Sequence, residues 1–140
     1  MKYLIGIDPG VTTGFCLYNK TKAKIEIVTS YSIIVAMEVV KEAHKKYGPD
    51  NIELVIEDAR KKHWFGTGKE VSARAQGAGS VKRDTKVWIE FCDTFNVKYK
   101  LVEPPKDLTK IKAERFKKLT GYKGRTNGHG RDAAMLVWGY

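Results

Sequence analysis

The chain begins with a short apolar run, residues 3–7, that stops at the sequence Asp8-Pro9-Gly10. Such a run predicts a buried strand, and Asp-Pro-Gly favours a turn because it cannot continue a helix. Asp8 is therefore expected at the end of a strand, with its carboxylate directed into a cleft. Strands predicted at residues 15–18 and 24–28 follow, and the three together indicate an antiparallel meander.

A helix and a fourth strand are expected next. The helix is indicated by residues that recur at helical spacing, namely Ile33, Met37, Val40 and His44. The glycine and proline at positions 48 and 49 end it. The apolar run at residues 52–57 then predicts a strand. A strand, helix, strand connection implies parallel pairing with a right-handed crossover, which can place this strand beside the first. Glu57, at its end, would then lie near Asp8.

A third carboxylate opens the last expected helix. His129 and Asp132 are three residues apart in the sequence, so they share one face of a helix. The small side chains of Ala133 and Ala134 would let this helix approach a sheet closely.

Three acids from three separate elements indicate a metal site: Asp8, Glu57 and Asp132. Magnesium prefers carboxylate oxygens and is commonly bound by one or two carboxylates together with substrate phosphate. Two such ions about 3.5–4 Å apart can stabilise both the attacking water and the leaving oxygen of an in-line displacement. We therefore expect two magnesium or manganese ions at a site that cuts phosphodiesters.

Each of these residues also has a purely structural interpretation. Asp8 could belong to an ordinary turn, and Asp132 could be favoured in a first helical turn by the helix dipole. His129 could be a solvated residue at a helix start. Asp58 alternates with Glu57 and should face the other way, which favours a surface or helix-cap role, so it is kept only as a reserve ligand. The joint pattern, in order and at suitable spacing, favours the metal site.

The charge of the chain favours a nucleic-acid partner. Its 26 Lys and Arg residues exceed its 16 acids, which gives a net charge of +10 at pH 7. Binding through such a surface neutralises phosphates and depends on salt. The alternative for each basic run is a solvated face. The candidate DNA contacts are Arg60, Lys61, Lys62, Trp64, Phe65, Lys69, Arg74, Lys82, Arg83, Lys106, Lys110, Lys112, Lys117, Lys118, Lys123 and Arg125.

Adjacent aromatic residues occur in an unusual place, because Trp64 and Phe65 lie between lysines and glycines. They could stack on an unpaired base or wedge into a junction, and each stacking contact is worth roughly 1–3 kcal/mol. Equally, they could anchor this segment on the protein or complete a dimer contact.

Two further helices and one strand complete the expected elements. A helix is expected over residues 75–94. One apolar stripe along it predicts either core packing or a dimer interface, and the stripe consists of Val81, Trp88, Phe91, Cys92 and Phe95. A fifth strand is expected at residues 97–102. An amphipathic helix then follows from the spacing of Leu108, Ile111, Phe116 and Leu119.

The 140 residues predict one compact domain, 1–140, without a signal peptide or a membrane-spanning run. A cytoplasmic location follows as an expectation. Cys16 and Cys92 are each placed in an apolar pattern and are expected to be buried free thiols.

The order and content of these motifs resemble the RuvC Holliday junction resolvases, especially the short versions from bacteriophages, within the RNase H-like superfamily. The resemblance covers nearly the whole chain. It implies an α/β fold with a mixed five-stranded sheet, the meander plus parallel strands, and helices on both faces. On matching positions it assigns the metals to Asp8, Glu57 and Asp132. The family's last motif often reads D-x-x-D-A, and here His129 replaces its first acid.

The resemblance also implies roles and partners. His129 could ligate a metal or orient or deprotonate water. The expected enzyme is a homodimer, joined through the helix at residues 75–94, that nicks four-way DNA junctions in symmetric pairs during recombination and repair. Its location would be the cytoplasm of a bacterial host if a phage encodes it.

Three alternatives stay open. A nuclease for structured RNA, such as pre-ribosomal RNA, would share the acids. A noncatalytic branched-DNA-binding module would keep the lysines without nicking. An ATP-binding member of the actin and sugar-kinase group also places an aspartate after its first strand, but its second phosphate motif is missing from this sequence.

Overall fold

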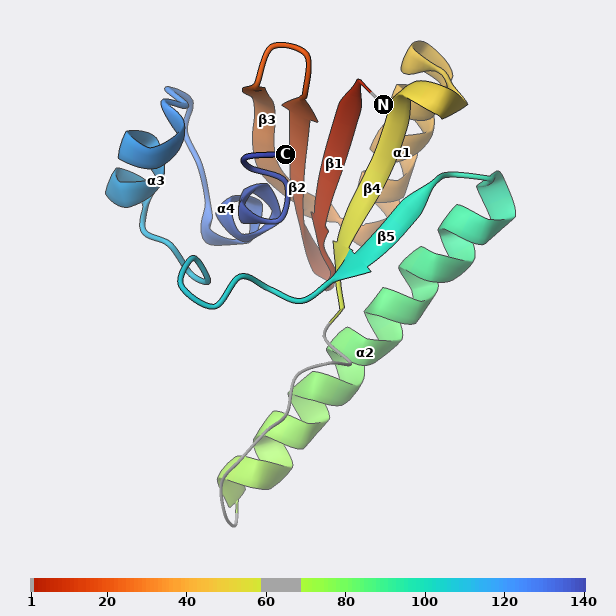
Figure 1. Ribbon diagram of the computed structural model, residues 1–140. Coiled ribbons are helices and arrows are strands. Elements are labelled where there is room, and N and C mark those ends of the chain that lie inside the picture. Colours follow the sequence, from red (N-terminus) through yellow and green to blue (C-terminus); the bar gives the residue numbers. More distant parts are fainter. Residues whose placement is uncertain (1, 59–68) are drawn as a thin grey trace.

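The structure is a computed structural model that describes residues 2–58 and 69–140, with the backbone alone for residues 69–81. One mixed sheet with the strand order β3-β2-β1-β4-β5 forms its centre (Figure 1). The strands are β1 Tyr3–Asp8, β2 Thr12–Asn19, β3 Lys24–Ser32, β4 Ile52–Glu57 and β5 Tyr99–Val102. The helices are α1 Ile33–Tyr47, α2 Lys69–Phe95, α3 Ala113–Thr120 and α4 Gly128–Met135, with a short 3-10 turn at Pro49–Asn51.

The strand directions are those expected from the sequence. β1 pairs antiparallel with β2, and β2 pairs antiparallel with β3, so the first three strands are a meander. β4 pairs parallel with β1 after the α1 crossover, and β5 pairs parallel with β4. The predicted α/β fold with a mixed five-stranded sheet is therefore confirmed.

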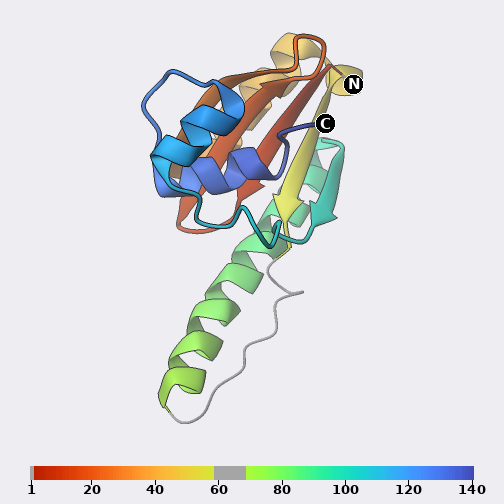
Figure 2. The same ribbon diagram turned by 60° about the vertical axis from the view of Figure 1, so that its left-hand side comes forward.

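Alternation along β1 divides the interior into two cores. Leu4 belongs to a core that contains α4 residues and the α3 residue Phe116. Ile5 and Ile7 belong to a second core on the other face, with residues of α1 and α2. Figures 1 and 2 show the same arrangement, with α3 and α4 on one face and α1 and α2 on the other. Helices on both faces were expected, because a sheet buried on both sides needs two covers.

The core interpretation of the α2 stripe is correct for three of its residues. Trp88, Phe91 and Cys92 are buried in the second core. Phe95 is instead 45% exposed, and the Lys41 ammonium lies 4.6 Å from the centre of its ring. The side chain of Val81 lies outside the described residues. The helix itself is longer than predicted, since it begins at Lys69.

The prediction that an amphipathic helix starts near Leu108 is wrong for its first turn, because α3 begins only at Ala113. The Pro105 carbonyl accepts from the Leu108 N–H at 3.3 Å and from the Thr109 hydroxyl at 2.8 Å, which closes a turn. Lys110 then has a φ of 55°, a left-handed conformation that interrupts a helix. Leu108 still packs on the first core, so the apolar spacing indicated burial correctly and the helix start incorrectly.

α4 lies almost in contact with the backbone of the sheet. A Cβ atom added at Gly6 of β1 would overlap the carbonyl oxygen of Ala133, and one added at Gly14 of β2 would overlap that of His129. On the helix side, a Cβ at Gly130 would lie 2.8 Å from the Thr29 carbonyl oxygen of β3. Glycines on both partners therefore fix how closely α4 can approach. The described part of the chain contains no helix that is long and apolar enough to cross a bilayer.

This contact predicts the effect of one added methyl group. Gly6→Ala should lower the free energy of unfolding by about 1–3 kcal/mol, because α4 must move away from β1. Urea denaturation followed by circular dichroism measures the change. Gly128→Ala is the matched control, because its Cβ would have only the Arg131 guanidinium, 4.0 Å away, as a neighbour. Equal stability of Gly6→Ala and the wild type would show that the close contact is not needed.

Both cysteines are buried free thiols, as predicted. Burial raises the pKa of the Cys16 thiol well above its usual range. Burial, and secondly the charge of Asp93, raise the pKa of Cys92 to about 12. The folded protein therefore keeps thiol protons that the unfolded chain loses above its ordinary value of 9.0.

A pH dependence of stability follows. Between the unfolded pKa and the raised folded pKa, the unfolded state binds fewer protons, so stability decreases as pH rises. Denaturation at about pH 8 and about pH 10 should show this decrease, and Cys92→Ala should show less of it. An identical decrease in Cys92→Ala would remove this thiol as a cause.

Candidate active site

The three carboxylates expected to act together line one small pocket. Asp8, Glu57 and Asp132 share a hollow of about 80 Å³ at one end of the sheet. Its other walls are Pro104, Pro105, Leu108, Thr109, Lys110, Met135 and Leu136. Side chains 49 and 75 residues apart in sequence are thus brought to one place by the fold.

The parallel pairing of β1 with β4 places the first two acids. Ile7 is level with Ile56 in this pairing, and Asp8 and Glu57 are the next residues of the two strands. By alternation, both face the side of the sheet that α4 covers. Glu57 is only 7% exposed, so its carboxylate is largely removed from bulk water.

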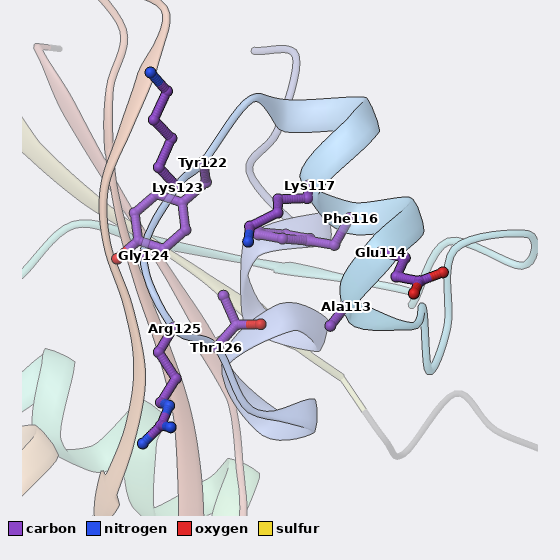
Figure 3. Close-up of a pocket in the computed structure, with 9 residues that line it drawn as sticks. All are labelled: Ala113, Glu114, Phe116, Lys117, Tyr122, Lys123, Gly124, Arg125 and Thr126. Atoms are coloured by element: carbon purple, nitrogen blue, oxygen red, sulfur yellow. The ribbon is translucent and has the colours of Figure 1, made fainter.

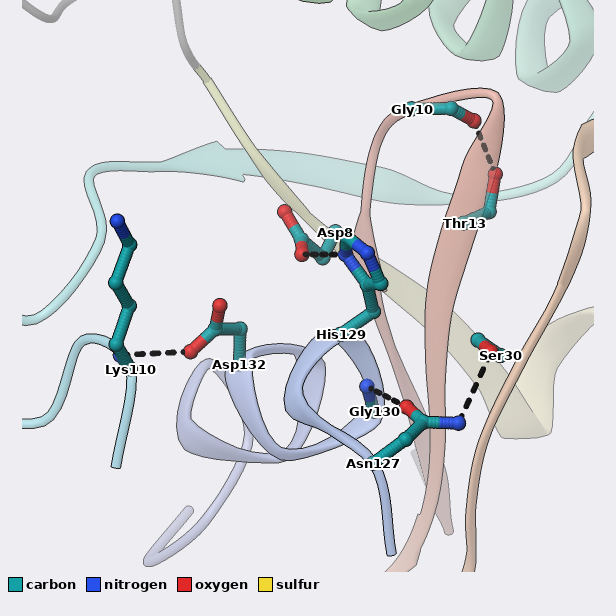
Figure 4. A network of polar contacts seen from close by, with 9 residues as sticks. All are labelled: Asp8, Gly10, Thr13, Ser30, Lys110, Asn127, His129, Gly130 and Asp132. Carbon is teal, nitrogen blue, oxygen red and sulfur yellow. Dashed lines mark hydrogen bonds and ion pairs between the residues drawn. The ribbon is translucent and has the colours of Figure 1, made fainter. Parts of the chain in front are cut away.

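A cap fixes the start of the helix that carries the third acid. The Asn127 side chain accepts from the Gly130 N–H at 2.8 Å and donates to the Ser30 hydroxyl at 2.9 Å (Figure 4). The first bond satisfies one of the free N–H groups of a helix start. The second ties the same residue to β3, so one side chain both begins α4 and holds it over the sheet. Neither interaction was predicted, although an asparagine three residues before Gly130 is a recognisable capping pattern.

His129 and Asp132 project from the first turns of α4 toward different partners. His129 Nδ1 lies 3.6 Å from Asp8 Oδ2, and the side chains are 57% and 15% exposed, respectively. Asp132 Oδ1 accepts from the backbone N–H of Lys110 at 2.9 Å. Figure 4 shows the two side chains on the same side of α4, with His129 facing Asp8 and Asp132 facing the Lys110 turn.

The turn before α3 therefore holds the Asp132 carboxylate, a role that the sequence did not indicate. Lys110 has a left-handed backbone, and its N–H is directed at the Asp132 carboxylate. The contact comes from the main chain, so no residue type in the sequence signals it. It fixes one oxygen of the Asp132 carboxylate.

The loop after β1 is also fixed. The Thr13 hydroxyl donates to the Gly10 carbonyl at 2.8 Å, which closes the turn that follows Asp8 (Figure 4). The Thr13 side chain is fully buried, and Gly10, whose carbonyl accepts the bond, is partly buried.

The donor set fits a hard divalent cation in its chemistry, since the pocket presents three carboxylates and His129 lies beside one of them. Within the part of the chain that the structure describes, no group of three or more His, Cys, Asp and Glu side chains is arranged to hold a metal ion. Magnesium does not require such a cage, because it is usually held by one or two carboxylates, waters and substrate phosphates.

Asp58 corrects one expectation. It directly follows β4 and is only 2% exposed, so the expected surface role is wrong. Its N–H donates to the Val102 carbonyl at 2.8 Å, which extends the pairing with β5 by one residue. Asp58 does not line the pocket of the three acids.

The basic residues expected to contact DNA divide into two sets. Those after β5 are all exposed, namely Lys106, Lys110, Lys112, Lys117, Lys118, Lys123 and Arg125. On α2, Lys82 is half-buried, and the exposed Arg83 has its Nε 3.8 Å from Asp84 Oδ1. Arg60, Lys61, Lys62, Trp64 and Phe65 lie outside the described residues, as do the side chains of Lys69 and Arg74.

The comparisons with known proteins find a likeness among solved structures. No family model and no curated protein matches the chain. Among solved structures, RuvC from Thermus thermophilus is similar over 97% of this chain and 90% of that chain, with 13% sequence identity and a TM-score of 0.48.

The cap predicts a test of how α4 is held. Asn127→Ala should lower the free energy of unfolding by about 0.5–2 kcal/mol, because the Gly130 N–H loses its acceptor. Asn127→Ser keeps an acceptor and should retain most of that stability. Thermal denaturation of both variants measures the difference. Equal losses in the two variants would show that the cap is not the source of the effect.

Proposed function

We propose that this protein is a metal-dependent endonuclease that nicks branched DNA, with four-way junctions as its main substrate. The observation that carries the proposal is the convergence of Asp8, Glu57 and Asp132 on one pocket. Carboxylates that come from three separate elements and line one pocket suit a magnesium site, because magnesium is usually held by one or two carboxylates together with waters and substrate phosphate.

The residues would hold the metal ions and the reacting groups in distinct ways. Asp8 and Glu57, from adjacent strand ends, and Asp132, from α4, would be the ligands of magnesium or manganese, two ions per site. Bound metal would supply an activated water and would neutralise charge on the phosphate oxygens. His129, half-exposed beside Asp8, would orient the attacking water or accept its proton, or serve as an additional ligand. Asp58 is not needed in this arrangement.

The reaction is hydrolysis of one phosphodiester. A water oxygen bonds to phosphorus as the bond from phosphorus to the 3′-oxygen breaks. The products are a 5′-phosphate and a 3′-hydroxyl, which takes up a proton. The three acids would hold the metal ions around the reacting phosphate, and the exposed lysines would bind the flanking phosphates.

The charge distribution supports a DNA substrate. The chain carries a net charge of +10, and Lys110 lies in the wall of the acidic pocket. Residues 106–125 contain eight basic residues against two acids, and they lead directly into α4. A pocket of acids with Lys110 in its wall and a basic segment in the chain before α4 suits a polyanion that must approach a negatively charged centre, because cations offset the repulsion.

A homodimer would match the symmetry of a four-way junction. A two-fold dimer presents two identical sites to two equivalent strands, which gives paired nicks. α2 is the proposed contact, and its exposed Val87 and Phe95 offer apolar surface at its second half. Roles in recombination and repair would follow from this substrate, and the resemblance to the short bacteriophage enzymes adds the proposal that a phage encodes the protein and that it acts in the bacterial host.

The proposal predicts separate effects on cleavage and binding. Asp8→Asn should abolish nicking of a fluorescent four-way junction in magnesium and should retain or tighten junction binding, because it removes a metal ligand and one negative charge. Glu57→Gln and Asp132→Asn should behave in the same way. Denaturing gels measure nicking, and gel shifts in calcium measure binding.

The matched control is Asp107→Asn, which removes an exposed acid that does not line the pocket. It should nick at the wild-type rate. Normal nicking by Asp8→Asn would refute the proposed role of Asp8. Parallel assays on linear duplex and structured RNA separate the junction enzyme from an RNA-processing nuclease, and wild-type binding without nicking would instead indicate a noncatalytic module.

A further inference from the structure

A second hollow lies between α3 and the segment that leads into α4. It has a volume of about 420 Å³ and is formed by residues of α3 and residues 122–126. Figure 3 shows the Lys117 side chain extending from α3 toward the opposite wall, which carries Tyr122 and Thr126. The volume is within the range of about 300–1,000 Å³ that is typical of small-ligand sites.

The walls combine an aromatic surface with cations. Phe116 and Tyr122 meet edge to face, with ring centres 6.3 Å apart and an angle of 74° between the planes. Phe116 is 1% exposed and anchors the pair in the core, whereas Tyr122 is only partly buried. Gly124 lets the backbone lie against the Tyr122 ring, because a Cβ there would come within 2.8 Å of it. The aromatic wall is therefore held in place from two sides.

Three exposed cations surround this wall: Lys117, Lys123 and Arg125. In Figure 3, Lys123 and Arg125 extend in opposite directions along the segment, and Lys117 extends from the other wall. One acid, Glu114, is present among the lining residues. Cations spread on either side of an aromatic wall suit a nucleotide within a strand, whose phosphates flank its base on both sides.

The segment is rigidly connected to the catalytic helix. The Arg131 guanidinium, on α4, donates to the Thr126 hydroxyl at 2.8 Å and to the Ile111 carbonyl at 2.8 Å. It thus joins Thr126, which lines the hollow, to the helix that carries His129 and Asp132, and it also holds Ile111, two residues before α3 begins. Thr126 precedes His129 by only three residues. A strand held at this wall would be held in register with the acidic pocket.

We infer that the hollow lined by Phe116, Lys117 and Tyr122 is a binding site for an unpaired nucleotide of the substrate strand, with its base on the aromatic wall and its phosphates on the lysines and Arg125. The inference rests on the proposed function for the identity of the strand as DNA. It adds a source of selectivity, because an unpaired nucleotide is present at a branch point and absent from intact duplex.

Binding of single strands tests the inference without cleavage. In the full-length Asp8→Asn protein, fluorescence anisotropy compares a labelled oligothymidylate of about eight nucleotides with a blunt duplex. Tyr122→Leu should weaken single-strand binding about 5- to 150-fold, the equivalent of one stacking contact, and change duplex binding less than about 2-fold. Tyr122→Phe keeps the ring and should bind as the parent does.

Charge variants keep the test valid if Tyr122→Leu fails to fold, which thermal denaturation detects. Lys123→Gln should weaken single-strand binding more than Lys45→Gln, which removes an exposed lysine from α1 on the other face of the sheet. Unchanged single-strand affinity in folded Tyr122→Leu, or equal effects of the two lysine variants, would overturn the inference. Competition by free thymidine monophosphate as strong as by the oligonucleotide would also overturn it, because the site would then take a free nucleotide.

The outcomes distinguish this site from the proposed nuclease. If folded Tyr122→Leu binds single strands as its parent does while the wild type nicks junctions, the nucleotide site is refuted and the proposed nuclease is unaffected. If the wild type does not nick junctions but prefers single strands, and Tyr122→Leu loses this preference, the nucleotide site is supported and the proposed nuclease is refuted.

Discussion

The close contact of α4 with the sheet is the constraint on which the candidate site depends. Gly6 and Gly14 leave no side chain between the strands and the helix, and Gly130 does the same from the helix side. Because the helix lies directly on β1 and β2, residues at its first turns reach the end of β1. A helix at ordinary side-chain distance from the sheet would carry Asp132 away from Asp8.

Two kinds of polar contact convert this packing into a defined site. The Asn127 side chain fixes where α4 begins, and the Lys110 main chain fixes one oxygen of Asp132. The acids themselves come from rigid positions, since two are at strand ends and one is on a capped helix. Rigid placement suits metal chemistry, in which ligands that are already in position lose little freedom when the ion and the phosphate bind.

The sequence predicted the strands and the approach of Glu57 to Asp8, because both follow from short apolar runs and from one crossover rule. Asp132 was joined to them by the order of the motifs and the family resemblance. It could not predict the Lys110 contact, which is made by a backbone N–H, or the late start of α3, where a left-handed residue interrupts a genuine apolar spacing. Asp58 was expected in a surface or helix-cap role, and its burial was missed because alternation gives the direction of a side chain and not what covers it. The roles of Trp64 and Phe65 remain predictions.

Anomalous diffraction from crystals soaked in manganese tests the proposed centre most directly. The convergence of acids predicts manganese peaks between the carboxylates of Asp8, Glu57 and Asp132, at coordination distances of about 2.0–2.3 Å from their oxygens. Their loss in crystals of Asp8→Asn would agree with that assignment. Manganese bound only at other acids, with the pocket of the three carboxylates free of any peak at saturating metal, would contradict it.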